Sequence, residues 1–173
     1  MVTSTTTYFG NRARAYVGVA GFTPALADKL AVTRGFEVNV TFENAELYGT
    51  DSIKRADQAR HTLKIDASLK GCKFDPSTSG TANLMHILMH ALSPTTGAIT
   101  SSIEDTNTIQ LFDVYIFFYG SANPTDNKVQ IKVTSAYIEG VPIPLPENDY
   151  ITMDLKFHGT DFSLVNNTSE PVA

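Results

Sequence analysis

Two histidines separated by four positions, His86 and His90, are the residues whose spacing first suggests chemistry. On a helix this spacing places both imidazoles on one face, as in zinc enzymes that take two ligands from a single helix. The metalloprotease form of that motif also needs a glutamate beside the first histidine, and Ile87 stands there instead. A third ligand would have to come from His61, His158 or a carboxylate. Two semi-exposed helical histidines explain the pattern without a metal, so we expect no metal or other cofactor.

The remaining candidates for catalysis are weaker. The sequence contains no GxSxG nucleophile motif, phosphate-binding loop or glycine-rich nucleotide fingerprint. Asp149 and Asp154 flank the start of a predicted strand, and paired carboxylates can hydrolyse glycosides, but the chain has no tryptophan to form a sugar platform. Cys72 is the single cysteine, which excludes an intrachain disulfide and favours a small buried hydrophobic role. We therefore predict that the protein is not an enzyme.

The composition describes one globular domain of 173 residues, with 42% hydrophobic and 18% charged residues. The net charge of −5 argues against a dedicated nucleic-acid binder, which gathers lysine and arginine on one face. The longest apolar run, Val114 to Tyr119, is too short to cross a bilayer, so no membrane association is expected. The N-terminus lacks the charged start and apolar run of a secretory signal, which favours folding in a cytoplasm.

Four segments alternate apolar and polar residues with the period of a strand. Side chains alternate across a strand, so each segment has one face for a core and one face for water. A fifth segment, Ile109–Tyr119, is apolar on both faces, so we expect both faces to be covered. Ala15–Ala20 and Lys128–Ile138 complete the predicted sheet, and the last strand ends at Gly159. The four alternating segments are Phe36–Phe42, Leu63–Leu69, Val129–Val133 and Ile151–Phe157.

One helix is predicted over residues 83–92, with Ser79 or Thr81 as its N-cap and Pro94 beyond its end. A helix of that length is marginal alone, so it must pack against the sheet. The predicted fold class is therefore mainly β, an antiparallel β-sandwich or barrel with one flanking helix. Within a single domain over 1–173, we predict an N-terminal arm over 1–14, a β body over 15–165 and a flexible C-terminal tail over 166–173.

A long connection, residues 43–60, interrupts the alternation between the first two alternating strands. Connections of this length are uncommon in compact domains and are usually functional or disordered. The segment has few glycine and serine residues and several large apolar ones, which favours a long hairpin or Ω-type loop that projects from the body. A disordered linker and a short helix remain the alternatives. Its charged residues alternate in sign: Glu46, Asp51, Lys54, Arg55, Asp57 and Arg60.

The order of these elements resembles that of the tail tube proteins of tailed viruses, a family similar to the inner tube of type VI secretion machines. The resemblance spans roughly Phe36 to Val165 and depends on element order and the long loop. It implies a β-sandwich or barrel that assembles into hexameric rings, stacked as a hollow tube in the virion tail and built in the host cytoplasm. The protein would then be a structural subunit of a conduit for genome delivery, with sheath, baseplate and tail-terminator proteins as further partners.

The resemblance also implies roles for two groups of residues. The long loop would reach the adjacent ring through Glu46, Leu47, Tyr48, Asp51, Ile53, Lys54, Arg55, Asp57 and Arg60. Polar strand faces would line the lumen, where DNA passes without specific binding, and these faces lack the basic stripe that would hold phosphates. The candidate lumen residues are Glu37, Asn39, Thr41, Lys64, Asp66, Lys132 and Asp154.

Two other classes of protein stay open. One is a capsid-decoration or carbohydrate-binding β-sandwich module, which would be a monomer or trimer that binds capsids or glycans. The other is a metal-dependent hydrolase that uses His86 and His90, which would contain stoichiometric zinc.

Overall fold

The computed structural model describes residues 13–25, 28–30, 32–48, 55–73, 84–94, 108–119, 128–141 and 152–168. In this part of the chain, eight antiparallel strands and one short helix confirm the predicted mainly β fold class. No helix among these residues is long and apolar enough to cross a bilayer. The elements are β1 (Arg14–Val19), β2 (Lys29–Leu30), β3 (Val32–Tyr48), β4 (Arg55–Lys73), α1 (Leu84–Leu92), β5 (Phe112–Tyr119), β6 (Lys128–Ile138), β7 (Thr152–Gly159) and β8 (Asp161–Thr168).

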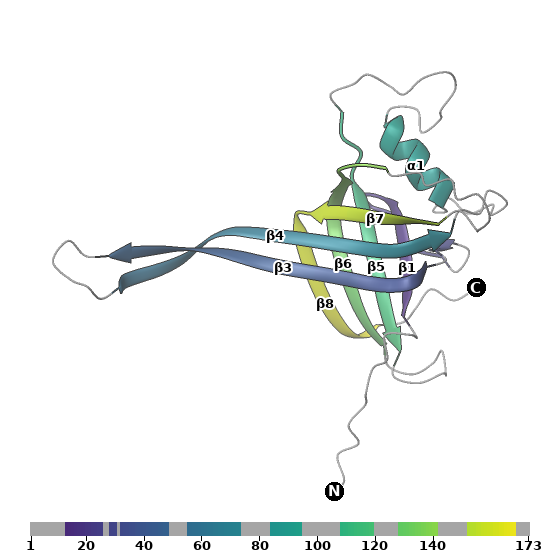
Figure 1. Cartoon of the computed structure of the whole chain (residues 1–173). Coiled ribbons are helices and arrows are strands. Elements are labelled where there is room, and N and C mark those ends of the chain that lie inside the picture. The colour runs from purple at the N-terminus through teal and green to yellow at the C-terminus, as the bar shows by residue number, and fades with distance from the viewer. Residues whose placement is uncertain are drawn as a thin grey trace, which may run out of the picture.

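The strands form two layers that share β6. The order is β2-β1-β5-β6-β7-β4-β3, and β8 also pairs with β6. The first part of β6 pairs with β5 and β8, whereas its last residues, Tyr137 and Ile138, pair with β7. A register shift opposite β5 and a positive φ of 50° at Ser135 mark the bulge where β6 changes layer. Figure 1 shows the hairpin layer, made of β3, β4 and β7, crossing the second layer, made of the other strands.

The hydrophobic core lies between these two layers. Ile65, Ala67 and Leu69 of β4 are buried at alternate positions, as the strand period predicts. The rings of Phe112 on β5 and Phe157 on β7 meet edge to face with centroids 6.1 Å apart, which joins the layers. The other buried residues of this core include Ala15, Val17, Val114, Ile116, Val133, Met153 and Leu155.

Both faces of β5 are buried, as predicted, but the predicted segment Ile109–Tyr119 is too long at its start, because Ile109 and Leu111 precede β5 and are exposed. Phe112, Val114 and Ile116 belong to the core, while Tyr115 and Phe117 point to the opposite side of the second layer. On that side they pack with Tyr16 and Phe22 in a separate aromatic cluster. One copy of the chain therefore buries both faces of its most apolar strand.

The helix α1 confirms the predicted helix and begins one residue later than expected. Leu84, Ile87 and Leu88 are buried in the core, at the spacing of one helical face. The helix packs beside β1 at one end of the two layers (Figure 1). Its last turn closes with the Ser93 amide donating to the Met89 carbonyl, just before Pro94.

The segment 43–60 is a hairpin whose strands continue farther than the sequence predicted. The β3–β4 ladder runs from Glu43↔Thr62 out to Leu47↔Asp57 and Tyr48↔Arg55, with register shifts at both ends of this stretch. The hairpin projects well beyond the two layers (Figure 1). Of the alternatives left open, the long hairpin is confirmed for the described residues and the short helix is wrong. Residues 49–54 lie outside the described residues.

The strand β8 was not predicted. The predicted sheet ends at Gly159 and the predicted flexible tail covers residues 166–173, but β8 extends along β6 as far as Thr168. It follows β7 after the single residue Thr160. At this corner a Cβ on Gly159 would collide with Val133 Cγ1, so the close approach of the two layers requires glycine. Residues 169–173 and the N-terminal residues 1–12 lie outside the described residues.

Candidate functional site

The outer side of the hairpin layer carries the polar residues that alternate with the core, and we call this the polar face. Cross-strand pairing places Asn39 opposite Asp66 and Thr41 opposite Lys64. Asp66 in turn lies opposite His158 of β7. Six of the seven candidate lumen residues therefore share one face: Glu37, Asn39, Thr41, Lys64, Asp66 and Asp154.

Lys132 lies apart from the other six. It belongs to the part of β6 that pairs with β5, where it stands opposite Tyr115. Its Nζ atom is 4.9 Å from the centroid of the Tyr115 ring and 3.4 Å from Asp113 Oδ2. The contact with Tyr115 is the largest cause that raises the pKa of Lys132, with Asp113 contributing further. Lys132 therefore lies on the side of the second layer that carries the separate aromatic cluster.

One ion pair and one side-chain hydrogen bond meet at Glu37, near one edge of the polar face. Lys70 Nζ lies 2.6 Å from Glu37 Oε2, and Asn39 Nδ2 donates to Glu37 Oε1 at 3.1 Å. The hydrogen bond from Lys70 lowers the pKa of Glu37, and the same contact raises the pKa of Lys70. Both side chains are close to half exposed, so the pair contributes little to stability. Sequence reasoning missed Lys70, although it continues the alternation of Lys64 and Asp66 along β4.

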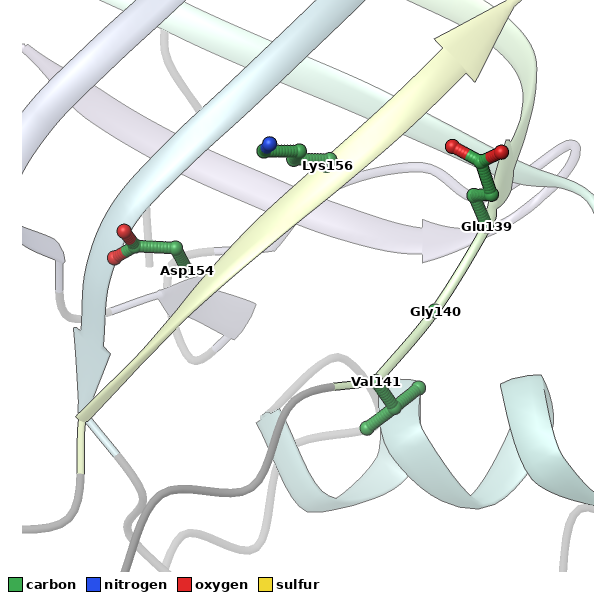
Figure 2. A pocket seen from close by; sticks show the side chains of 5 residues that line it. All are labelled: Glu139, Gly140, Val141, Asp154 and Lys156. Atoms are coloured by element: carbon green, nitrogen blue, oxygen red, sulfur yellow. The ribbon is translucent and has the colours of Figure 1, made fainter.

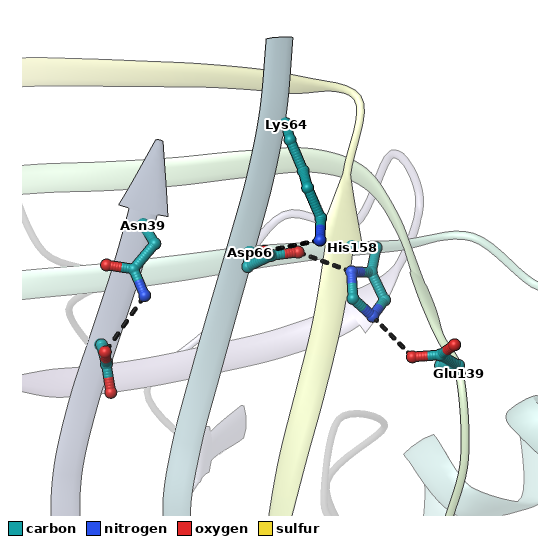
Figure 3. Close-up of polar contacts among 6 residues, drawn as sticks. Asn39, Lys64, Asp66, Glu139 and His158 are labelled. Atoms are coloured by element: carbon teal, nitrogen blue, oxygen red, sulfur yellow. Dashed lines mark hydrogen bonds and ion pairs between the residues drawn. The ribbon is translucent and has the colours of Figure 1, made fainter. Parts of the chain in front are cut away.

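A second chain of polar contacts joins β4, β7 and the segment just beyond β6 (Figure 3). His158 Nδ1 lies 2.6 Å from Asp66 Oδ1, and His158 Nε2 lies 3.1 Å from Glu139 Oε2, just beyond β6. Lys64 Nζ extends this chain to Asp66 Oδ2 at 3.5 Å. A neutral imidazole donates from one nitrogen only, so both histidine contacts can be hydrogen bonds only in the imidazolium form. The arrangement ties side chains together and includes no nucleophile.

Asp154 has a structural contact as well as a place on the polar face. Its Oδ1 accepts a hydrogen bond from the Gly71 amide at 2.7 Å. Gly71 has a φ of 69° in the bulge where the β4–β7 register shifts. The neighbouring Cys72 is fully buried, and burial raises the pKa of its thiol to about 12, which confirms the predicted small hydrophobic role.

An open hollow of about 450 Å³ lies between β7 and the segment that follows β6. Glu139, Gly140 and Val141 line it on one side, and Asp154 and Lys156 of β7 line it on the other (Figure 2). Its described lining combines charges of both signs with the apolar side chain of Val141. Lys156 has no ion-pair or hydrogen-bond partner among the described residues. Sequence reasoning did not single out Glu139, Val141 or Lys156 as site residues.

The two histidines of α1 form a close pair. Their ring centroids are 4.3 Å apart at an angle of 70°, and His90 Nδ1 is buried without a hydrogen-bond partner among the described residues. Burial is the main cause that lowers the pKa of His86, the charge of His90 lowers it further, and Asp28 opposes both. His158 binds carboxylates on the polar face and does not join this pair. No group of three metal-ligating side chains comes together in the described part of the chain.

The lowered pKa of His86 predicts a loss of stability in mild acid. Because the folded protein favours the neutral ring, this contribution is complete above the ordinary pKa of 6.5 and is lost as the pH falls below it. Urea midpoints measured between about pH 7.5 and pH 5 should fall more steeply for the wild type than for His86→Gln. Parallel curves for the two proteins would contradict this assignment.

Of the nine residues predicted to contact the adjacent ring, six lie in the described strands of the hairpin. Leu47 lies opposite Asp57 and Tyr48 opposite Arg55 in the ladder. Glu46 and Arg60 lie in the same two strands. The other three predicted residues, Asp51, Ile53 and Lys54, lie outside the described residues.

Comparison with known proteins shows a likeness of fold. No protein-family model matches the chain, and no curated protein matches it in sequence. A chain of the PVC sheath/tube terminator of an extracellular contractile injection system is 13% identical, with a TM-score of 0.55 and coverage of 89% of this chain and 93% of the other. A chain of the PVC sheath–tube complex is 13% identical, with a TM-score of 0.54 and coverage of 89% and 88%. A chain of the tube-terminating cap of the anti-feeding prophage is 15% identical, with a TM-score of 0.56 and coverage of 95% of both chains.

These similarities concern the fold alone. The chain has a fold that also occurs in structures of phage-tail-like contractile injection systems.

Proposed function

We propose that this protein is a non-enzymatic structural subunit of a phage-tail-like tube, in which copies form hexameric rings that stack around a central channel. The observation that carries the proposal is the β3–β4 hairpin, which leaves the two layers and extends into solvent (Figure 1). A two-stranded hairpin gains little stability in water by itself, so an extended ladder of this length indicates a surface made for a partner. The fold shared with terminator, tube-complex and cap structures supports the same class of role.

Open strand edges and exposed apolar residues support assembly with identical copies. Among the described residues, β3 pairs only with β4, and β8 pairs only with β6, so each strand leaves one edge unpaired. Phe42 and Leu63 form a cross-strand pair at the root of the hairpin and are 43% and 46% exposed. Leu164 on β8 is 62% exposed. Joining such edges between subunits removes the unpaired backbone groups that otherwise invite aggregation.

The polar face is our candidate for the channel wall. Two of its lysines lie against carboxylates, in the Lys70–Glu37 and Lys64–Asp66 pairs, and these pairs leave no lysine stripe on the described face to hold phosphates. In a virion such a wall would let DNA pass during genome delivery, with sheath, baseplate and terminator proteins as further partners of the tube.

A tube terminator or cap is the second candidate, because two of the similar structures are of a terminator and a cap. The two roles differ in what the protein builds. A tube subunit polymerises without limit, whereas a terminator forms one ring that ends a tube.

Electron microscopy and particle mass of the purified full chain test the proposal. We expect rings on the order of 6 nm to 10 nm across that stack into tubes as the protein concentration rises. Rings that never stack would favour the terminator. A protein that stays monomeric at every concentration would overturn the proposal, and glycan or capsid binding by that monomer would favour the decoration or carbohydrate-binding module.

A further inference from the structure

The contacts of His158 with two carboxylates depend on the charge of its ring (Figure 3). Nδ1 lies 2.6 Å from Asp66 Oδ1 on β4, and Nε2 lies 3.1 Å from Glu139 Oε2, just beyond β6. An ionised carboxylate only accepts hydrogen bonds, so an imidazolium donates to both partners. A neutral ring has one N–H and turns the lone pair of its other nitrogen toward a carboxylate, which repels it. Loss of one proton therefore breaks one of the two contacts.

The contact with Asp66 is the one that a neutral ring keeps. Its distance is the shorter of the two, and the Asp66 side chain is 32% exposed, against 79% for Glu139. Glu139 is therefore easily hydrated once it leaves the ring, whereas an unpaired Asp66 would stay partly desolvated. A neutral His158 should then carry its proton on Nδ1, with Glu139 released to solvent.

Glu139 follows a short joint between the two layers. Among the described residues, only Tyr137 and Ile138 of β6 pair with β7, opposite His158 and Phe157. The rings of Tyr137 and His158 pack with centroids 5.3 Å apart. The Glu139–His158 contact thus adds one cross-link to a ladder of two residue pairs. Because the ladder is so short, losing this contact should loosen the backbone at the end of β6.

Other charged and titratable side chains surround the ring. Lys64 lies 3.5 Å from Asp66 Oδ2, and Lys156 precedes His158 by two positions on the same face of β7. Tyr137 and Glu139 face it from the β6 side. Among these residue types, histidine alone ordinarily changes charge between about pH 5 and pH 8.

We propose that Asp66, His158 and Glu139 form a pH switch at the joint between the two layers. In mild acid the imidazolium ties the end of β6 to β7 and β4. As the pH rises, the ring loses the proton on Nε2, Glu139 is released and the joint loosens. The switch lies within one copy of the chain, so it goes beyond the proposed function and does not depend on it.

Nuclear magnetic resonance of the full chain tests which contact is lost. Ring ¹⁵N chemical shifts measured at about pH 5 and about pH 8 distinguish the imidazolium and the two neutral forms. We expect the imidazolium in acid and the Nδ1–H form at the higher pH. A neutral His158 in the Nε2–H form would keep Glu139 instead of Asp66, and a ring in the same form at both values would not switch. Either result would overturn the proposal.

Hydrogen exchange tests whether the joint responds. Acid also acts on His86 of α1, so a local measurement is needed in place of global stability. After correction for intrinsic exchange, residues 137–141 should exchange about twofold to fivefold faster at the higher pH, the change that the loss of one exposed ion pair gives. Glu139→Gln should abolish this difference, because a side-chain amide accepts from an imidazolium and donates to a neutral Nε2.

Asp161→Asn is the matched control, since Asp161 is an exposed carboxylate whose described contact is with the adjacent Phe162 amide. It should keep the full pH response of the wild type. The switch is wrong if the wild type shows no pH response at residues 137–141, or if Glu139→Gln responds as strongly as the wild type. Neither result bears on tube formation, and a chain that never assembles leaves the switch to be judged by these two measurements.

Discussion

Replacing Glu46–Gln58 with the dipeptide Asn-Gly should give a subunit that folds normally and no longer builds tubes. Ala45 and Ala59 are a cross-strand pair, so a two-residue type I′ turn can close the shortened hairpin without changing its register. The deletion keeps every core residue that the structure describes, Ile65, Ala67 and Leu69 of β4 included. It removes the whole projecting end, so the expected loss of stacking is complete and not partial.

Circular dichroism melting and electron microscopy of the shortened chain measure the two effects separately. A variant with the intact hairpin and serine at both Ala45 and Ala59 controls for changes at the splice, and it should still polymerise. Tubes formed by the shortened chain would remove the hairpin from the assembly. If the shortened chain lost its cooperative unfolding, the hairpin would belong to the folding core.

Asp113→Ala should be among the most destabilising single substitutions in this protein, at about 3 to 5 kcal/mol. The Asp113 carboxylate is buried, with 3% exposure, and accepts hydrogen bonds from the Gly21 amide at 3.2 Å and the Ser135 amide at 3.1 Å. Lys132 Nζ lies 3.4 Å from the same carboxylate. Alanine would leave two backbone donors and an ammonium group without this acceptor at the bulge of β6.

Urea denaturation of the monomeric form measures this effect. Asp161→Ala is the control, because Asp161 is exposed and, among the described residues, its carboxylate accepts a hydrogen bond only from the adjacent Phe162 amide. The free energy of unfolding should therefore change by about 0.5 kcal/mol or less. Asp113→Asn should fall between the two, since its amide keeps one acceptor oxygen. Equal stability of the Asp113 and Asp161 variants would show that the buried carboxylate is not what holds the bulge.

The elements that pack on the core were predictable from the sequence, and those that leave it were not. Strands such as Phe36–Phe42 alternate because one face must be buried. The hairpin beyond Glu43 and the exposed strand β8 are not subject to that requirement. Leu164 and Val165 are adjacent in sequence and both exposed, so β8 has no alternating signal. For these segments the pairing is set by neighbouring strands.

The polar face was predictable only in part, for a related reason. Alternation identifies which residues of a strand face water, and register decides which of them meet. Asp66 and His158 are opposite each other only because β4 and β7 pair in one particular register. Lys132 does not lie on the polar face, because β6 changes layer at Ser135. No pattern of residues in the sequence predicts this bend. The buried Asp113 was missed because its partner Gly21 is distant in sequence.

The shared strand β6 has a mechanical consequence. A pull on the hairpin acts along β4, parallel to the strand and perpendicular to the hydrogen bonds that join β4 to β7. Those bonds must then break together in shear, whereas a pull at right angles would open them one after another. From β7 the load continues through Tyr137 and Ile138 into β6, and so into the other layer. A subunit built this way resists stretching along the β3–β4 hairpin.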